Sequence, residues 1–184
     1  MEVIGLESRF YPNSLRKLKR PPKELFVEGN AEILNSHSLS VIGSRTCTEY
    51  GERWCKRFVK DLVEYNLTIV SGLAVGIDGI AHRQALDSGG KTIAVLPCGL
   101  ENIYPRENIK LFKQILKNGG AVITEYTSKT KAEYNKFLER NRIVSGLSIA
   151  TLVIEAAYRS GTSVTAGFAK KQERDVYCLP RQSR

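Results

Sequence analysis

The chain has 184 residues, of which 42% are hydrophobic and 26% are charged, and its net charge is +9. This composition is ordinary for a single folded domain and excludes a disordered or fibrous protein. No apolar run reaches the about 20 residues that cross a bilayer, and the four cysteines include no Cys-x-x-Cys pair. We therefore expect a cytoplasmic protein with reduced thiols, no membrane contact, no metal site and no cofactor.

Residues 1–36 differ in character from the rest, because they hold three of the six prolines and a cluster of basic residues. We interpret them as an N-terminal extension that packs on the main sheet, with a possible edge strand at residues 25–28. Residues 37–184 then form the main domain.

Short apolar runs rich in β-branched residues alternate with candidate helices from residue 37 onward. Strands are expected at residues 39–42, 68–70, 92–96, 121–124, 152–154 and 176–179, each buried on both faces. Helices are expected at residues 49–65, 79–88, 107–117, 135–145 and 164–173. This alternation predicts an α/β fold with a mainly parallel sheet and helices on both faces.

The segments that follow the strands are candidates for a binding site, because open parallel sheets place ligands outside the carboxyl ends of their strands. Gly43 and Ser44 follow the first strand, and Arg45 lies in a turn where its guanidinium could pair with a phosphate. A tight turn with a surface arginine is the simpler alternative. Arg106, just before the helix at residues 107–117, is a second candidate for a phosphate contact.

The stretch SGLAVGIDGIAH at residues 71–82 carries Gly72 and Gly76 directly after a strand. A dinucleotide fingerprint requires G-x-G-x-x-G, whereas the spacing here is G-x-x-x-G-x-x-G. The stretch therefore fails as a dinucleotide motif, although an anion near the following helix start remains compatible with it. We expect Asp78 to cap that helix and His82 to pack nearby, rather than an acid and base pair.

A further anion site is expected where the last helix begins, because the amides and hydroxyls of SGTS form a favourable nest there. Its members are Ser160, Gly161, Thr162 and Ser163. Arg140 and Arg142 lie about 200° apart on a helix, so both can bind one ligand only near a helix end. The basic net charge favours a polyanionic partner such as nucleic acid.

These segments, in this order, resemble the DNA-processing protein A family (DprA/Smf). The similarity runs through Tyr11-Pro12, Gly29-Asn30, VIGSR, SGLAVGID with Ala81-His82, TIAVLPCGL, Tyr104-Pro105 with Asn108, ITEY, RNRIVSGLS, and VIEA with SGTSVTA and CLP. It covers nearly the whole chain. The motifs are loose one by one, and their combination is specific.

The resemblance implies an extended Rossmann-like fold, with residues 37–184 as the DNA-binding domain. It further implies a homodimer that binds single-stranded DNA and helps to load the RecA recombinase during natural transformation, without enzymatic activity. By position, the resemblance assigns the DNA site to Gly43, Ser44, Arg45, the turn from Gly72 to Gly76, Arg106, Phe137, Arg140 and Asn141. Phe137 would stack on a base, with burial in the core as the equal alternative.

The sequence departs from the family pattern in three respects. Val75 stands where the family commonly has arginine, which removes one expected phosphate contact, and Leu138 stands where it has proline. The family pattern also continues beyond CLP through further helical sequence, often into a winged-helix domain. We expect no winged-helix domain within these 184 residues.

Two other functions remain open from the residues. One is a nucleotide phosphoribohydrolase on a related fold, although its P-G-G-x-G-T-x-x-E signature is only partly matched by YRSGTSVTAG. Cys98 follows a strand but lacks an evident base, so a packed thiol is expected there. The other is an interaction protein that uses exposed apolar surface for self-association or for RecA.

Overall fold

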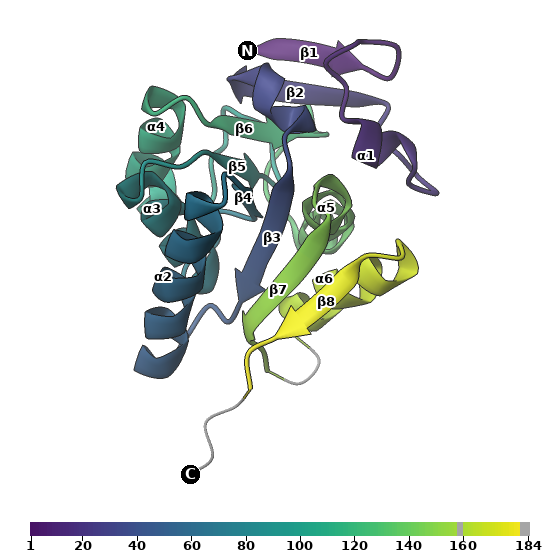
Figure 1. The fold of residues 1–184 in the computed structure, drawn as a ribbon. Coiled ribbons are helices and arrows are strands. Elements are labelled where there is room, and N and C mark those ends of the chain that lie inside the picture. Colours follow the sequence, from purple (N-terminus) through teal and green to yellow (C-terminus); the bar gives the residue numbers. More distant parts are fainter. Residues whose placement is uncertain (158–159, 181–184) are drawn as a thin grey trace.

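One mainly parallel sheet organises the molecule (Figure 1). The computed structural model describes residues 1–157 and 160–180. Within them, eight strands follow the order β1-β2-β6-β5-β4-β3-β7-β8. They are β1 (Glu2–Gly5), β2 (Glu24–Gly29), β3 (Ser38–Gly43), β4 (Thr68–Ser71), β5 (Thr92–Val95), β6 (Ala121–Thr124), β7 (Ala150–Glu155) and β8 (Asp175–Cys178). Strands β3 to β8 run parallel, and β2 pairs antiparallel with both β1 and β6.

Helices cover both faces of this sheet (Figure 1). On one face lie α2 (Glu49–Glu64), α3 (Ile77–Asp87) and α4 (Ile109–Lys117), and on the other α1 (Asn13–Arg16), α5 (Tyr134–Leu147) and α6 (Gly161–Lys171). Two short 3₁₀ turns, η1 (Ala31–Asn35) and η2 (Arg106–Asn108), complete the described elements. Because successive strand side chains point to opposite faces, Val41 packs against α2 and α3 whereas Ile42 packs against α5. The expected α/β fold of Rossmann-like type is confirmed.

Several expected boundaries and burial patterns were wrong. The strand expected at residues 25–28 exists as β2, but β1 lies outside it and forms the edge. The strand expected at residues 176–179 is not buried on both faces, because β8 is the opposite edge and Tyr177 is 56% exposed. The last helix begins at Gly161 rather than at residue 164, with Ser160 as its N-cap.

The N-terminal segment contributes to the main core rather than resting on it. Tyr11 and Leu15 are completely buried in the same apolar cluster as Ile143 of α5 and Ile123 of β6. The Tyr11 hydroxyl donates a hydrogen bond of 2.7 Å to the Pro22 carbonyl. Burial raises the pKa of Tyr11 to about 12, so this hydroxyl remains a donor at neutral pH.

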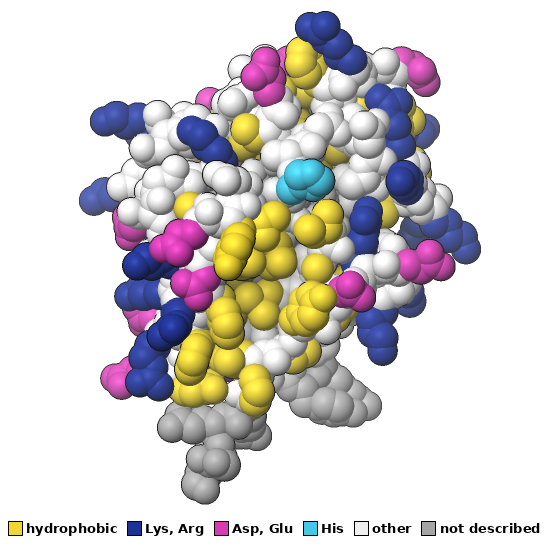
Figure 2. All heavy atoms as spheres, in the orientation of Figure 1, with side chains coloured by type: hydrophobic (Ala, Val, Ile, Leu, Met, Phe, Trp, Pro, Cys, Tyr) yellow, Lys and Arg dark blue, Asp and Glu magenta, His cyan; other side chains and the backbone are white. Residues whose placement is uncertain are grey.

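An apolar face remains open between α2 and strands β7 and β8 (Figure 2). The buried side of α2 consists of Gly51, Cys55 and Val59, so the stripe of Trp54, Phe58 and Leu62 stays partly exposed. Tyr177 of β8 is exposed on the neighbouring edge. These residues form an exposed apolar surface. In the described part of the chain, none of the helices is both long and apolar enough to span a bilayer.

His82 is a buried core residue on α3. Its Nδ1 lies 2.6 Å from the hydroxyl oxygen of Thr92, and that hydroxyl donates to the Ile69 carbonyl at 2.7 Å. Because the Thr92 proton is already used, Nδ1 must be the donor, which leaves Nε2 unprotonated. The expectation that His82 packs is confirmed. Asp78 does not cap the helix, because Gly76 occupies the N-cap position.

Tyr11→Phe tests how the N-terminal segment is held. The change leaves the buried Pro22 carbonyl without its donor, so the free energy of unfolding should fall by about 1 to 3 kcal/mol. Urea denaturation measures it. The control is Tyr65→Phe, because Tyr65 is 81% exposed and its loss should leave stability unchanged. Equal stability of the two variants would contradict this role of Tyr11.

His82 should make stability depend on pH. Burial lowers the pKa of His82 from 6.5 to about 3, so below pH 6.5 the unfolded chain binds a proton that the folded chain does not. The stabilisation is complete above pH 6.5 and is lost as the pH falls toward 3. Relative to His82→Gln, the wild type should lose up to about 1.4 kcal/mol per pH unit in this window. Urea titrations at several pH values test this, with His37→Gln at an exposed site as the control; a constant difference between wild type and His82→Gln would refute it.

Candidate functional site

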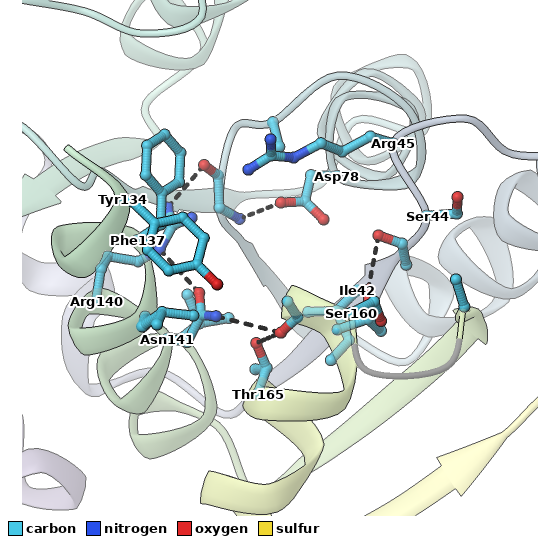
Figure 3. A pocket seen from close by; sticks show the side chains of 18 of the residues that line it. Ile42, Ser44, Arg45, Asp78, Tyr134, Phe137, Arg140, Asn141, Ser160 and Thr165 are labelled. Atoms are coloured by element: carbon cyan, nitrogen blue, oxygen red, sulfur yellow. Dashed lines mark hydrogen bonds between the residues drawn. The ribbon is translucent and has the colours of Figure 1, made fainter. Parts of the chain in front are cut away.

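A cleft of about 610 Å³ opens at the carboxyl ends of β3 and β4. Its walls come from the loop after β3, the turn after β4, the first half of α5 and the start of α6 (Figure 3). Parallel strands bring these segments together because their carboxyl ends meet at one edge of the sheet. The cleft therefore lies where the sequence predicted a ligand.

Most of the predicted site residues line this cleft. They are Gly43, Ser44, Arg45, Gly72, Phe137, Arg140, Asn141, Ser160, Gly161 and Thr162. Arg106 lines a cavity of about 310 Å³ that shares Arg45, Gly72 and Phe137 with the cleft. Gly76 and Ser163 do not line either cavity. Val75 lines the smaller cavity and is 37% exposed.

Gly76 brings the loop after β3 onto the start of α3. Its φ is +77°, and a Cβ there would lie 2.3 Å from the Ser44 carbonyl oxygen. The same carbonyl accepts a hydrogen bond of 3.1 Å from the Ile77 amide. The first amide of α3 is thus already bonded to protein and is not available to an anion at this helix start.

Arg140 is buried at the floor of the cleft, and only 4% of the residue is exposed to solvent. Its guanidinium donates to the carbonyl oxygens of Gly72, at 2.8 Å, and Val95. Burial lowers the pKa of Arg140 to about 10, while the charge of Asp78 acts against this shift, so the guanidinium remains protonated at neutral pH. Arg140 therefore supplies positive potential to the cleft while its hydrogen bonds hold the strand ends.

Asp78 is the acidic residue among the described residues that line the cleft. It accepts a hydrogen bond of 3.1 Å from the Gly72 amide, and a Cβ on Gly72 would lie 2.7 Å from both Asp78 and Arg140. Burial raises the pKa of Asp78, and the nearby Arg140 charge and the Gly72 amide oppose that effect. Position 72 thus requires glycine, because the buried side chains of Asp78 and Arg140 leave no room for a Cβ atom there.

Arg45 and Phe137 form the mouth of the cleft (Figure 3). The Arg45 guanidinium is exposed and lies 5.2 Å from the centre of the Phe137 ring, and Tyr104 meets that ring edge-on at 5.6 Å. Phe137 is half-buried, so part of the ring faces the cleft. Tyr134, one helical turn earlier, is 76% exposed and also lines the cleft.

The start of α6 forms the opposite wall. Its first amides lack intrahelical acceptors, and those of Gly161 and Thr162 belong to residues that line the cleft. The predicted nest is smaller than expected, because the Ser160 hydroxyl accepts from the Ser163 amide and the Thr162 hydroxyl donates to the Gly43 carbonyl at 3.0 Å. Among the described residues, backbone amides rather than hydroxyls are the donors of this wall that have no hydrogen-bond partner.

The two arginines of α5 serve different places. The helix runs from Tyr134 to Leu147, so Arg140 and Arg142 lie on different faces. Both terminal nitrogens of Arg142 donate to Glu125, at 2.6 Å each, away from the cleft.

Sequence reasoning missed Tyr104 and Tyr134 as lining residues. A signal existed for Tyr134, because it precedes Phe137 by three residues and positions i and i+3 share a helix face. Tyr104 belongs to the Tyr104-Pro105 motif, but nothing in the sequence shows that it meets Phe137. Cys98 is a packed thiol as expected, and burial raises its pKa. In residues 1–157 and 160–180, no group of three or more His, Cys, Asp or Glu side chains could hold a metal ion.

The cleft thus combines an exposed arginine, helix amides that have no partner among the described residues, and aromatic rings. Arginine and amides at a helix N-terminus favour anions, and exposed ring faces favour flat ligands. A phosphate attached to a planar group fits this combination.

Known proteins share this architecture and sequence. The family model described as DNA recombination-mediator protein A matches residues 2–184. Protein Smf of Escherichia coli (strain K12) is 46% identical over 178 residues, which are 97% of this chain and 48% of that protein. The chain thus spans about half the length of that relative.

Two solved structures are similar over almost the whole chain. The X-ray structure of DNA processing protein A from Streptococcus pneumoniae matches with a TM-score of 0.93 and 37% identity, covering 98% of this chain and 63% of that one. DNA processing protein A from Helicobacter pylori, whose structure addresses its single-stranded DNA binding mode, matches with a TM-score of 0.89 and 32% identity, covering 99% of this chain and 82% of that one. With these matches, the chain belongs to the DNA recombination-mediator protein A family.

Proposed function

We propose that the protein binds single-stranded DNA in the cleft, through the phosphate backbone and without regard to base sequence. As a cytoplasmic homodimer it helps to load the RecA recombinase during natural transformation, and it catalyses no reaction. The observation that carries DNA binding is the position of exposed Arg45 beside the Phe137 ring, opposite the amides of α6. The Helicobacter pylori relative, whose structure concerns single-stranded DNA binding, supports the same ligand class.

Each group of the cleft matches one part of a single strand. Arg45 and the amides of Gly161 and Thr162 suit phosphate oxygens, which need charge and directed donors. Phe137 and Tyr134 offer ring faces on which a base can stack, a contact worth about 1 to 3 kcal/mol per base. In a duplex the base faces are already stacked on one another, so these rings favour a single strand.

Sequence independence follows from the same groups. Amides and an arginine at the mouth of the cleft recognise phosphates, which carry no sequence information, and a ring face accepts any base. Base reading needs side chains that present donors and acceptors to base edges in a fixed plane. Asn141, the amide side chain of the cleft, instead donates to the Gly161 carbonyl at 3.3 Å.

A binding role is favoured over nucleotide hydrolysis by the state of the carboxylate in the cleft. Hydrolysis of a glycosidic bond calls for a carboxyl group that can reach the reacting atoms. Among the described lining residues that group is Asp78, which is buried and accepts from the Gly72 amide. Incubation with nucleoside monophosphates and chromatography for free base separates the two functions, because turnover would establish the enzyme.

The homodimer is supported by the open apolar face that carries Trp54, Phe58 and Tyr177. A solvated face of this kind is stabilised when a second copy covers it. Light scattering with the substitution Phe58→Lys tests this assignment, since a dimer that persists would place the interface elsewhere.

Loading of RecA is tested by strand exchange on DNA coated with single-strand binding protein, with and without the present protein.

Arg45→Ala should weaken binding of different single strands by a similar factor. Loss of a charge-assisted contact of about 1.5 to 3 kcal/mol corresponds to about a tenfold to hundredfold loss of affinity. The salt slope, log affinity against log salt, should become shallower by about 0.7 for the one phosphate released. Fluorescence anisotropy with homopolymeric and mixed oligonucleotides measures both. Arg83→Ala, at an exposed position of α3, removes the same charge and should have little effect; loss of affinity for selected sequences alone would contradict backbone recognition.

Val75→Arg should strengthen binding. Val75 lines the cavity next to the cleft, together with Arg45 and Arg106, so an arginine there can reach a further phosphate. Affinity for single strands should rise and the salt slope should steepen by about 0.7. The matched control is Val3→Arg, which adds the same charge on the 50% exposed Val3 of β1, at the far edge of the sheet. A similar gain in both variants would show that only net charge matters.

A further inference from the structure

A second basic depression lies away from the cleft, between the N-terminal segment and the C-terminal end of α6. Its volume is about 1010 Å³. Its walls are residues 14–20 on one side and residues 168–174 on the other, with Arg142 of α5 between them. We call it the basic groove. Figure 2 shows Lys and Arg side chains gathered along the right-hand edge of the molecule, where Figure 1 labels α1 and α6.

The groove carries a strong excess of positive charge. Its cationic lining residues besides Arg142 are Lys17, Lys19, Arg20, Lys171 and Arg174. Against these stands one carboxylate in the lining, Glu173. The charge of Arg142 is already balanced by Glu125, with two hydrogen bonds of 2.6 Å. Two walls of like charge that face one depression repel each other, and an anion between them would relieve this.

The walls of the groove are held in place by hydrogen bonds. Nε of Arg142 donates to the Arg20 carbonyl at 3.2 Å, which ties the N-terminal segment to α5. The Arg174 guanidinium donates through Nη2 to the Gly146 carbonyl at 3.4 Å. Its Nε is buried and has no hydrogen-bond partner among the described residues. A buried donor without an acceptor is costly, so the Arg174 side chain would gain stability by turning this nitrogen toward a ligand oxygen in the groove.

Two helices connect the groove to the cleft. The start of α6 lines the cleft and its last turn lines the groove, and its 11 residues span about 16 Å. On α5, Asn141 lines the cleft and the next residue, Arg142, lines the groove. A chain of phosphates that leaves the cleft past α6 therefore meets a second row of cations.

We propose that the basic groove binds a second stretch of the single strand whose first stretch occupies the cleft. This inference rests on the proposed function. Lys17, Lys19 and Lys171 suit phosphates as exposed point charges. Leu18 and Phe168 give the groove apolar surface, and a half-buried ring between cations is a combination that single-strand binding surfaces use. An acidic protein segment would use the cations alone and leave the ring without a role.

The test compares short and long strands. Oligothymidylates from about 6 to about 30 nucleotides cover the range from one site to several. The variant Lys19→Gln/Lys171→Gln removes two exposed charges from opposite walls of the groove, and Lys113→Gln/Lys117→Gln removes two exposed charges from α4, on the other face of the sheet. Circular dichroism confirms the fold of each, and anisotropy across a salt series measures affinity.

We expect the wild type to bind long strands at least tenfold more tightly than short ones. The groove variant should bind short strands as the wild type does and should lose most of this gain. Its salt slope on long strands should be shallower by about 1.4, for two phosphates at about 0.7 each. The α4 variant should keep the gain and the slope.

Three outcomes would overturn the inference. If the groove variant still binds long strands more tightly than short ones, or if its affinity for short strands falls as much as its affinity for long ones, the groove does not bind a second stretch of the strand. If polyglutamate displaces long strands from the wild type and binds the groove variant poorly, the groove serves an acidic protein. If short strands bind and depend on Arg45 but length adds nothing, this inference fails while the proposed function stands; if short strands do not bind at all, both fail.

Discussion

The site depends on one buried cation. Arg140 ties the carbonyl ends of β4 and β5 together from below, through Gly72 and Val95, and it is shielded from water by the residues above it. A guanidinium can do this because it offers five donors in one plane and stays charged even when burial lowers its pKa. Asp78, on the other side of Gly72, limits the electrostatic cost. The cleft is therefore preorganised, with a buried guanidinium held in place at its floor.

The charges of the protein divide into those that build the structure and those that remain for a ligand. Arg140 and Arg142 are neighbours on α5, yet one holds strand ends and the other is paired with Glu125. Exposed Arg45 and the lysines of the basic groove have no such structural task in the described part of the chain. Net charge alone would count all of them equally.

Much of the fold could be predicted from the sequence, because apolar runs such as those of β4 and β5 are buried on both faces and permit one interpretation. The four-residue strand β1 could not, because EVIG is too short to show a period and becomes a strand only by pairing with β2. The sequence of the edge strand β8 resembles that of the buried strands, because the apolar pattern does not show which strand has a neighbour on one side only.

Most residues that the sequence assigned to a binding site line one cleft, but the task of each residue within it could not be predicted from the sequence. Motif position assigned Arg140 to DNA, but whether an arginine on a helix faces solvent or a strand end is decided by packing. Gly76 was grouped with ligand contacts because glycine permits close approach, and the group that approaches is the Ser44 carbonyl. Tertiary contacts between segments distant in sequence decide such cases.

The exposed edge of the sheet has a practical consequence. β8 presents one side of its backbone without a neighbouring strand in the described residues, and Tyr177 and Cys178 are exposed along it. Unprotected strand edges template pairing between molecules, and an exposed thiol can lock such pairs by oxidation. Concentrated preparations should accordingly be kept with a reductant, and Cys178→Ser offers a simple way to separate covalent aggregates from specific assemblies.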